Sequence, residues 1–138
     1  MKRFFKVGVA ALFALLSTTV FAQDKLVREQ LNLSGFTAIQ ASGVADVYLT
    51  KGTQEKVEVE IQPEYRKHLK VGVNGGTLNI KWQNDEKGRN RNYNDLEVKV
   101  YVTYKSLNSL TGSGATNFFT ENTLSTEKLA LDLSGANN

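Results

Sequence analysis

One histidine and no cysteine limit the catalytic chemistry available to this chain of 138 residues. Catalysis by a thiolate is excluded, and a Ser-His-Asp arrangement would have to use His68. His68 lies in the charged stretch YRKHLK, where we expect a solvated or helix-capping side chain. Zinc and iron sites need further His or Cys ligands, which the sequence lacks. We therefore expect no catalytic residue and no cofactor.

Acidic and amide side chains could instead hold calcium, which prefers oxygen ligands. The candidates are Asp46, Asp132 and Asn137, and their spacing is not that of an EF-hand loop. At the corners of a β-structure, Asp and Asn more often bond to nearby backbone and serve turns. We expect no metal site from these residues.

Paired carboxylates and arginines supply an enzymatic alternative, a β-helix enzyme that acts on polysaccharides as a lyase or hydrolase. Glu58 and Glu60 could form such a pair, but they alternate with the apolar residues of 57–61. This alternation places both carboxylates on the wet face of a strand. The other candidates for this chemistry are Asp85, Glu86, Arg89 and Arg91. Because the alternative rests on analogy of fold alone, we expect a non-enzymatic protein.

The stretch 83–95, QNDEKGRNRNYND, has no apolar periodicity and carries three positive and three negative charges. This composition is typical of an exposed loop between two strands. Arg89, Arg91 and Tyr93 could contact a glycan or an acidic partner, because loops on a rigid scaffold often carry binding residues. A solvated hairpin connection is the simpler interpretation.

Aromatic residues offer another kind of site, a platform on which sugars stack. The residues considered for it are Tyr48, Trp82, Tyr101 and Tyr104, with Phe118 and Phe119 as an exposed patch. Trp82 continues the phase of Leu78 and Ile80, which favours a place in the core. Tyr101 is out of phase with the valines of its strand, so we expect it to face outward. A platform needs at least two such rings on one side.

Apolar residues alternate with polar ones in several segments, which is the period of a half-buried strand. Asn74-Gly75-Gly76 predicts a tight hairpin between two of these segments, and proline in a first turn favours a short helix at 63–68. The sequence thus predicts an all-β protein. The alternating sets are Val57, Val59 and Ile61; Leu69, Val71 and Val73; Leu78, Ile80 and Trp82; Leu96, Val98, Val100 and Val102; and Leu129, Leu131 and Leu133.

A short phrase repeats near the C-terminus: Ser113-Gly114-Ala115-Thr116-Asn117 returns 21 residues later as Ser134-Gly135-Ala136-Asn137-Asn138. With Ile39 and Gly43, the chain holds three copies of apolar-x-x-Ser-Gly-small-x-Asn/Asp. A repeat of about 20 residues is typical of one coil of a β-solenoid. We expect stacked coils toward the C-terminus, with an antiparallel β-sandwich as the alternative. Antiparallel hairpins in the N-terminal half fit either fold.

The first 22 residues predict an export signal, in which basic Lys2, Arg3 and Lys6 precede a short apolar run and a cleavage site at Ala22. No other stretch approaches the roughly 20 apolar residues of a membrane span. We therefore expect no transmembrane segment after signal cleavage and one β-rich domain at 23–138. That domain carries 14 basic and 14 acidic residues, so we expect no nucleic-acid partner. The protein should reach the periplasm, the outer membrane surface or the extracellular space.

The chain carries four stretches in a specific order: LSGFTAIQASGVADVYLTKGTQEKVEVE, GGTLNIKW, LEVKVYVTYKSLNSLTGSGATNF and LDLSGANN. Together they cover most of 31–138 and resemble the auto-transporter adhesin, head GIN domain family of secreted envelope proteins. The resemblance implies a right-handed β-helix or β-solenoid, and it supplies no catalytic residue.

Members of that family usually carry more Ser-Gly-Ala coils, so we expect the domain to be truncated at its C-terminus. An open solenoid end leaves an unpaired, partly apolar edge, through which the chain could self-associate. We expect a secreted, non-enzymatic, adhesin-like protein of the bacterial cell envelope. Its partner would be a glycan or another envelope or surface component.

Overall fold

The computed structural model describes residues 26–83, 96–121, 124, 126 and 128–136. Its regular structure is an eight-stranded sheet and one short helix, which confirms the all-β prediction. Within the described ranges, no helix is long and apolar enough to cross a membrane. The elements are β1 (Val27–Leu31), β2 (Ala38–Lys51), β3 (Lys56–Ile61), α1 (Pro63–Arg66), β4 (Leu69–Asn74), β5 (Thr77–Trp82), β6 (Val98–Tyr104), β7 (Ser109–Thr120) and β8 (Ala130–Leu133).

Three expectations fall outside the described residues. They concern the signal peptide at 1–22, the side chains of the loop at 84–95, and Asn137. Asp85, Glu86, Arg89, Arg91 and Tyr93 all belong to that loop.

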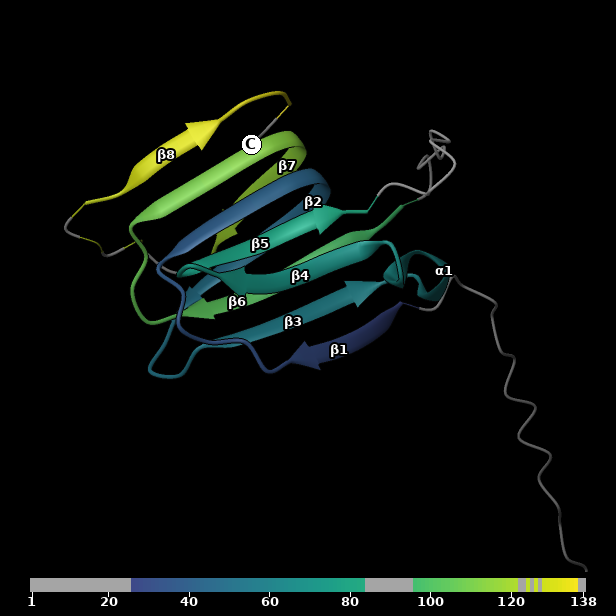
Figure 1. Ribbon diagram of the computed structural model, residues 1–138, viewed down its shortest axis with the longest axis horizontal. Coiled ribbons are helices and arrows are strands. Elements are labelled where there is room, and N and C mark those ends of the chain that lie inside the picture. The colour runs from purple at the N-terminus through teal and green to yellow at the C-terminus, as the bar shows by residue number, and fades with distance from the viewer. Residues whose placement is uncertain (1–25, 84–95, 122–123, 125, 127, 137–138) are drawn as a thin grey trace, which may run out of the picture.

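Strand β2 organises the sheet because it bends at Gly43 and pairs along both of its edges. On one edge its first half pairs with β5 and its second half with β6. On the other edge β7 follows it through the bend. The sheet therefore curls into two arms around one core (Figure 1). The first arm holds β4, β5, β8 and the first halves of β2 and β7, and the second arm holds β1, β3, β6 and the second halves.

The hydrophobic core lies between the two arms. Every second residue of the central strands points into it, as the period-two pattern predicts. Trp82, which the sequence favours for the core, is only partly buried against it. The buried apolar residues are Phe36, Ile39, Ala41, Ala45, Val47, Leu49, Val57, Val59, Ile61, Leu69, Leu78, Ile80, Val98, Val100, Val102, Tyr104, Leu107 and Leu110.

The strand pairing is mixed. The pairs β1–β3, β3–β6 and β4–β5 are antiparallel, whereas β2–β5, β2–β6, β2–β7 and β7–β8 are parallel. The parallel pairs contradict the alternative of an antiparallel sandwich. Among the described residues the sheet is open and curled.

The two local turn predictions are confirmed. Gly75 and Gly76, with φ of +58° and +77°, join β4 to β5 as a two-residue hairpin. Positive φ at both central residues is the requirement of the turn that suits the twist of a hairpin. Pro63 begins α1, the short helix expected at 63–68.

Of the two alternatives expected for His68, solvated or helix-capping, the solvated one is wrong, because the residue is only 8% exposed. The backbone fixes its position at the junction of α1 and β4. Its N–H donates to the Tyr65 carbonyl at 3.0 Å, and its own carbonyl accepts from the Gln83 N–H at 2.7 Å. The imidazole Nε2 is buried and has no hydrogen-bond partner in the described part of the chain.

Three glycines, Gly43, Gly114 and Gly135, form a stack of corners at the bend. The registers Gly43↔Gly114 and Leu110↔Leu131 confirm the alignment expected from the repeat. The three φ angles are +87°, +77° and +88°. A β-carbon on Gly114 would lie 3.0 Å from the Gly43 carbonyl oxygen, and one on Gly135 would lie 2.6 Å from the Gly114 carbonyl oxygen. Only glycine combines this φ with so close a backbone contact.

Strand β8 has the expected phase but not the expected burial. Leu131 and Leu133 lie opposite the inward Leu110 and Gly112 of β7, yet they are 59% and 41% exposed. In the described ranges β8 pairs with β7 alone, so no strand covers its other edge. An apolar residue in the correct phase is buried only where a neighbouring strand also covers it.

Tyr104 ends β6 inside the core and is 1% exposed. Its hydroxyl has no hydrogen-bond partner among the described residues, and burial raises the pKa of this phenol. Because an unsatisfied buried polar group costs about 1–3 kcal/mol, we expect Tyr104→Phe to raise the free energy of unfolding by ~1 kcal/mol. Urea denaturation followed by circular dichroism measures this change. A loss of stability would show that the hydroxyl has a partner after all.

Candidate binding surface

Three aromatic side chains line up on the outer face of the second arm. Tyr101 of β6, Tyr48 of β2 and Phe119 of β7 form this aromatic row, in which each ring stacks on the next. The ring centroid of Tyr48 lies 5.1 Å from that of Tyr101 and 5.0 Å from that of Phe119. Aromatic pairs contribute about 0.5–1.5 kcal/mol each beyond area burial. Phe119 is 42% exposed, so the row is open to solvent at the β7 end.

The register of the sheet creates this row. Tyr48 lies directly opposite Tyr101 on one side and Phe119 on the other. The neighbours Val47 and Leu49 point into the core, so the side chain between them must leave the opposite face. Adjacent strands lie about 4.8 Å apart, which matches the distance between stacked rings. In-register parallel pairing thus turns three separate aromatic residues into one surface feature.

Charged side chains close the row at its β1 end. The Arg28 guanidinium lies 4.6 Å from the ring centroid of Tyr101, and its Nε donates to Glu58 at 2.8 Å. Lys56 pairs with the same carboxylate at 2.7 Å. Hydrogen bonds from Lys56 and Arg28 hold the pKa of Glu58 below its usual range, and the bond to Glu58 raises the pKa of Arg28. One end of the row is therefore charged, and the other end is aromatic and open.

A polar row runs beside the aromatic row. The side-chain amide of Asn117 donates to Asp46 at 2.9 Å, in the ladder expected from the repeated Asn/Asp position. Lys99 lies on the other side of Asp46, and its pairing with Glu97 at 3.1 Å raises the pKa of Lys99. A tyrosine phenol is protonated at neutral pH and can donate a hydrogen bond, and burial raises the pKa of Tyr101 further.

Comparison with known families gives a match over residues 35–138 to the family described as "Putative auto-transporter adhesin, head GIN domain". The chain belongs to this family. The resemblance noted in the sequence is confirmed over residues 35–138. No curated protein matches the chain.

Solved structures share the fold of this head GIN domain. A "putative adhesin" from Bacteroides fragilis is 24% identical, with a TM-score of 0.71 over 84% of this chain and 52% of the other. A "putative adhesin" from Parabacteroides merdae is 19% identical, with a TM-score of 0.66 over 79% and 44%. A "putative lipid binding protein" from Parabacteroides distasonis is 20% identical, with a TM-score of 0.68 over 79% and 46%. The chain spans about half the length of these three proteins.

The head GIN domain brings together only some of the aromatic candidates. Tyr101 faces outward, as the sequence predicts. The prediction of Tyr104 as a platform residue is wrong, because its side chain points from β6 into the core. Phe118 packs against the core and is not part of an exposed patch. Trp82 lies on the first arm, where its indole N–H donates to the Val44 carbonyl at 3.0 Å.

The paired carboxylates Glu58 and Glu60 face outward, as their alternation predicts. Arg28 contacts both of them, Glu60 at 3.7 Å. A carboxyl whose pKa is lowered by two cations stays ionised, and it is a poor proton donor for cleaving a glycosidic bond. Through their contacts with Arg28, both carboxylates belong to the charged end of the surface.

The calcium candidates do not meet in the head GIN domain. Asp46 lies on the second arm and Asp132 on the first arm, and Asn137 lies outside the described residues. Among the residues that the structure describes, no three His, Cys, Asp or Glu side chains cluster as metal ligands would. The Asp46 carboxylate accepts a hydrogen bond from the side-chain amide of Asn117.

Proposed function

We propose that this head GIN domain is an exported, non-enzymatic, adhesin-like protein of the bacterial cell envelope, and that it binds a surface glycan through the aromatic row. The observation that carries the proposal is the alignment of Tyr101, Tyr48 and Phe119 on one exposed face. Tyrosine combines apolar area with a polar tip, and it is enriched at binding surfaces. Membership in a family described as adhesins supports the adhesive role.

The proposal includes a β-solenoid-like scaffold. The support for it is the parallel stacking of β2, β7 and β8 and the alignment of their glycine corners. In stacked architectures, equivalent positions of successive strands form rows across a long surface. Such a scaffold would repeat a binding feature along the protein. An export signal at 1–22, a domain at 23–138 and delivery to the periplasm, outer membrane surface or extracellular space complete the proposal.

Binding of the chain without residues 1–22 to an array of neutral and acidic oligosaccharides tests this function. We expect binding to at least one glycan. The double variant Tyr48→Ala, Phe119→Ala should weaken that binding at least about tenfold, since aromatic residues in binding sites often contribute more than 1 kcal/mol each. The row is on the outer face, so both proteins should give the same circular dichroism spectrum.

The matched control is Leu131→Ser with Leu133→Ser, which removes exposed apolar side chains from β8 and leaves the aromatic row intact. It should retain glycan binding, and sedimentation analysis tests whether this edge mediates self-association of two copies. Equal binding by the aromatic variant, or no binding at all, would overturn the proposal. Cleavage of a glycan that is lost on changing Asp85 or Arg89 would favour the enzymatic alternative instead.

A further inference from the structure

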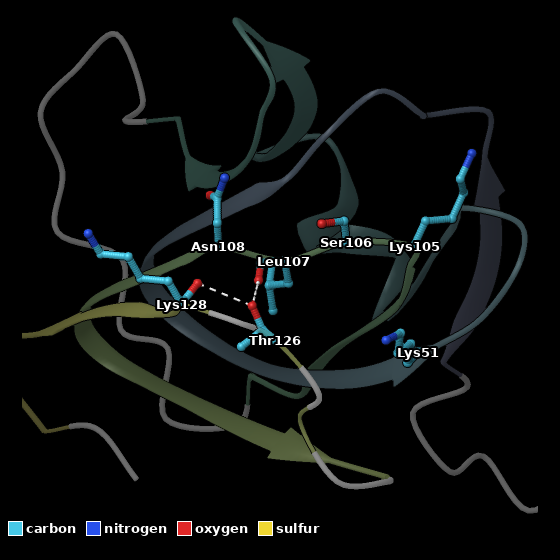
Figure 2. A pocket seen from close by; sticks show the side chains of 7 residues that line it. All are labelled: Lys51, Lys105, Ser106, Leu107, Asn108, Thr126 and Lys128. Atoms are coloured by element: carbon cyan, nitrogen blue, oxygen red, sulfur yellow. Dashed lines mark hydrogen bonds between the residues drawn. The ribbon is translucent and has the colours of Figure 1, made fainter.

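A groove lies near the ends of several strands, beside the connections that follow β6 and precede β8. It is formed where β2 ends, where β6 connects to β7, and where the chain returns toward β8 (Figure 2). Its volume is about 570 Å³, within the usual range for ligand sites. Its polar lining residues are Lys51, Lys105, Ser106, Asn108, Thr126 and Lys128, and we refer to it as the lysine groove.

Hydrogen bonds hold the walls of the lysine groove in place. The Thr126 hydroxyl lies 2.8 Å from the carbonyl oxygen of Leu107 and 3.1 Å from that of Lys128, so it ties together two chain segments (Figure 2). Leu107 is 2% exposed and anchors the connection between β6 and β7 in the core. The Asn108 N–H donates to the Thr37 carbonyl at 2.8 Å. These contacts fix Leu107, Asn108 and Thr126, and residues that are already fixed lose less conformational entropy when a ligand binds.

The charged side chains among the described lining residues of the groove are all positive. The lining residues that the structure describes include three lysines and no Asp or Glu. Lys105 and Lys128 form no salt bridge within the described ranges, whereas Arg28, Lys56 and Lys99 on the second arm are all paired. Residues 23–138 have 14 basic and 14 acidic residues, so three lysines without an acidic residue among the described lining residues are a local excess of positive charge. An anion would find a positive potential here.

The positions of the ammonium groups indicate an extended ligand. Figure 2 shows the side chains of Lys105 and Lys128 at opposite ends of the groove, with Ser106 and Asn108 between them. Separate charges suit a polymer with spaced negative groups better than one compact anion. The hydroxyl and amide between them suit hydrogen bonding to sugar hydroxyls. None of the described lining residues is aromatic, so this part of the groove offers no stacking platform of the kind found in single-stranded nucleic-acid sites.

We infer that the lysine groove is a binding site for an acidic polysaccharide, separate from the aromatic row. Lysine is a compact point charge on a flexible stem, so carboxylate and sulfate groups are both suitable partners. The inference does not depend on the proposed glycan site, because no residue is shared between the two surfaces.

Dextran sulfate and dextran provide a matched pair of probes, since they share a backbone and differ in charge. Polygalacturonate adds a carboxylate polymer. We expect the full chain to bind dextran sulfate and polygalacturonate in fluorescence anisotropy, more weakly as salt increases, and not to bind dextran. Lys105→Gln with Lys128→Gln should lower the affinity at least tenfold and leave the circular dichroism spectrum unchanged, because both side chains are exposed.

The control variant is Lys70→Gln with Lys81→Gln, which removes the same charge from a cross-strand lysine pair on the first arm. It should change the affinity less than twofold. An equal loss in both variants would show general electrostatic attraction and overturn the inference, as would a failure to bind either acidic polymer. Binding only to vesicles that contain phosphatidylglycerol would assign the groove to lipid headgroups instead. The aromatic double variant should keep its affinity for dextran sulfate, so the two proposals can fail separately.

Discussion

Replacing Gly114 by alanine is expected to lower the free energy of unfolding by about 2–5 kcal/mol. Gly114 has φ of +77°, where an L-residue with a side chain loses ~1–2 kcal/mol. The new β-carbon would also lie 3.0 Å from the carbonyl oxygen of Gly43 and 3.2 Å from its nitrogen and Cα. These are backbone atoms in a paired strand, so they cannot rotate away as a side chain could. The overlap must separate β7 from β2 at the bend.

The only tryptophan of the chain is placed to report this separation. The indole ring of Trp82 covers Gly43, so closely that its Cδ1 would lie 2.5 Å from a β-carbon there. Urea unfolding followed by tryptophan emission therefore measures the corner itself, and circular dichroism measures the sheet. We expect the midpoint to fall in both signals with the same slope, as it does when one cooperative unit is destabilised.

Gly72→Ala is the control for this prediction. Gly72 lies in β4, has no positive φ, and a β-carbon there would meet no atom within 4 Å. Alanine removes conformational freedom from the unfolded chain, so the variant should gain between about 0 and 1 kcal/mol. If Gly72→Ala and Gly114→Ala lost equal stability, the stacked corners would not be the source of the constraint.

The parts of this fold that could be predicted are those in which a local sequence pattern determines the structure. Alternating valines in β3 and β6 could be assigned from the sequence, because the period alone determines which face is buried. The glycine corners could be aligned because the repeat carries an apolar residue at a constant offset before each glycine. The bend of β2 was harder to predict. Its inward residues near the corner are Ala41, Gly43 and Ala45, which give almost no hydropathy signal.

The candidate site depends on information that is not local. Tyr48, Tyr101 and Phe119 lie far apart in the sequence, and only the register of three strands makes them neighbours. The lysine groove is a more extreme case, since Lys51 ends β2 and Lys105 and Lys128 come from two separate connections. No period or spacing links such residues. The burial of Tyr104 was readable from its phase in β6, but the lack of a partner for its hydroxyl was not.

Replacing Phe36 by alanine is expected to cost about 3–5 kcal/mol, the usual loss for a buried phenylalanine. Phe36 is 2% exposed and lies just before β2, where the chain enters the core. The Glu55 carboxylate accepts hydrogen bonds from the N–H groups of Gly35 and Phe36, at 3.0 and 3.1 Å to Oε2. These bonds hold the backbone in place, so the surrounding core cannot move in to fill the cavity. Denaturation in urea measures the loss.

Phe119→Ala makes the same chemical change on the outer face. Phe119 is 42% exposed and contacts the Tyr48 ring, so its removal should cost only ~1 kcal/mol. Equal losses at positions 36 and 119 would show that the aromatic row is structural and would weaken the case for a binding surface. A small loss of stability in Phe119→Ala would strengthen that case. The aromatic row would then contribute little to folding, and its exposure would be explained better by a ligand than by stability.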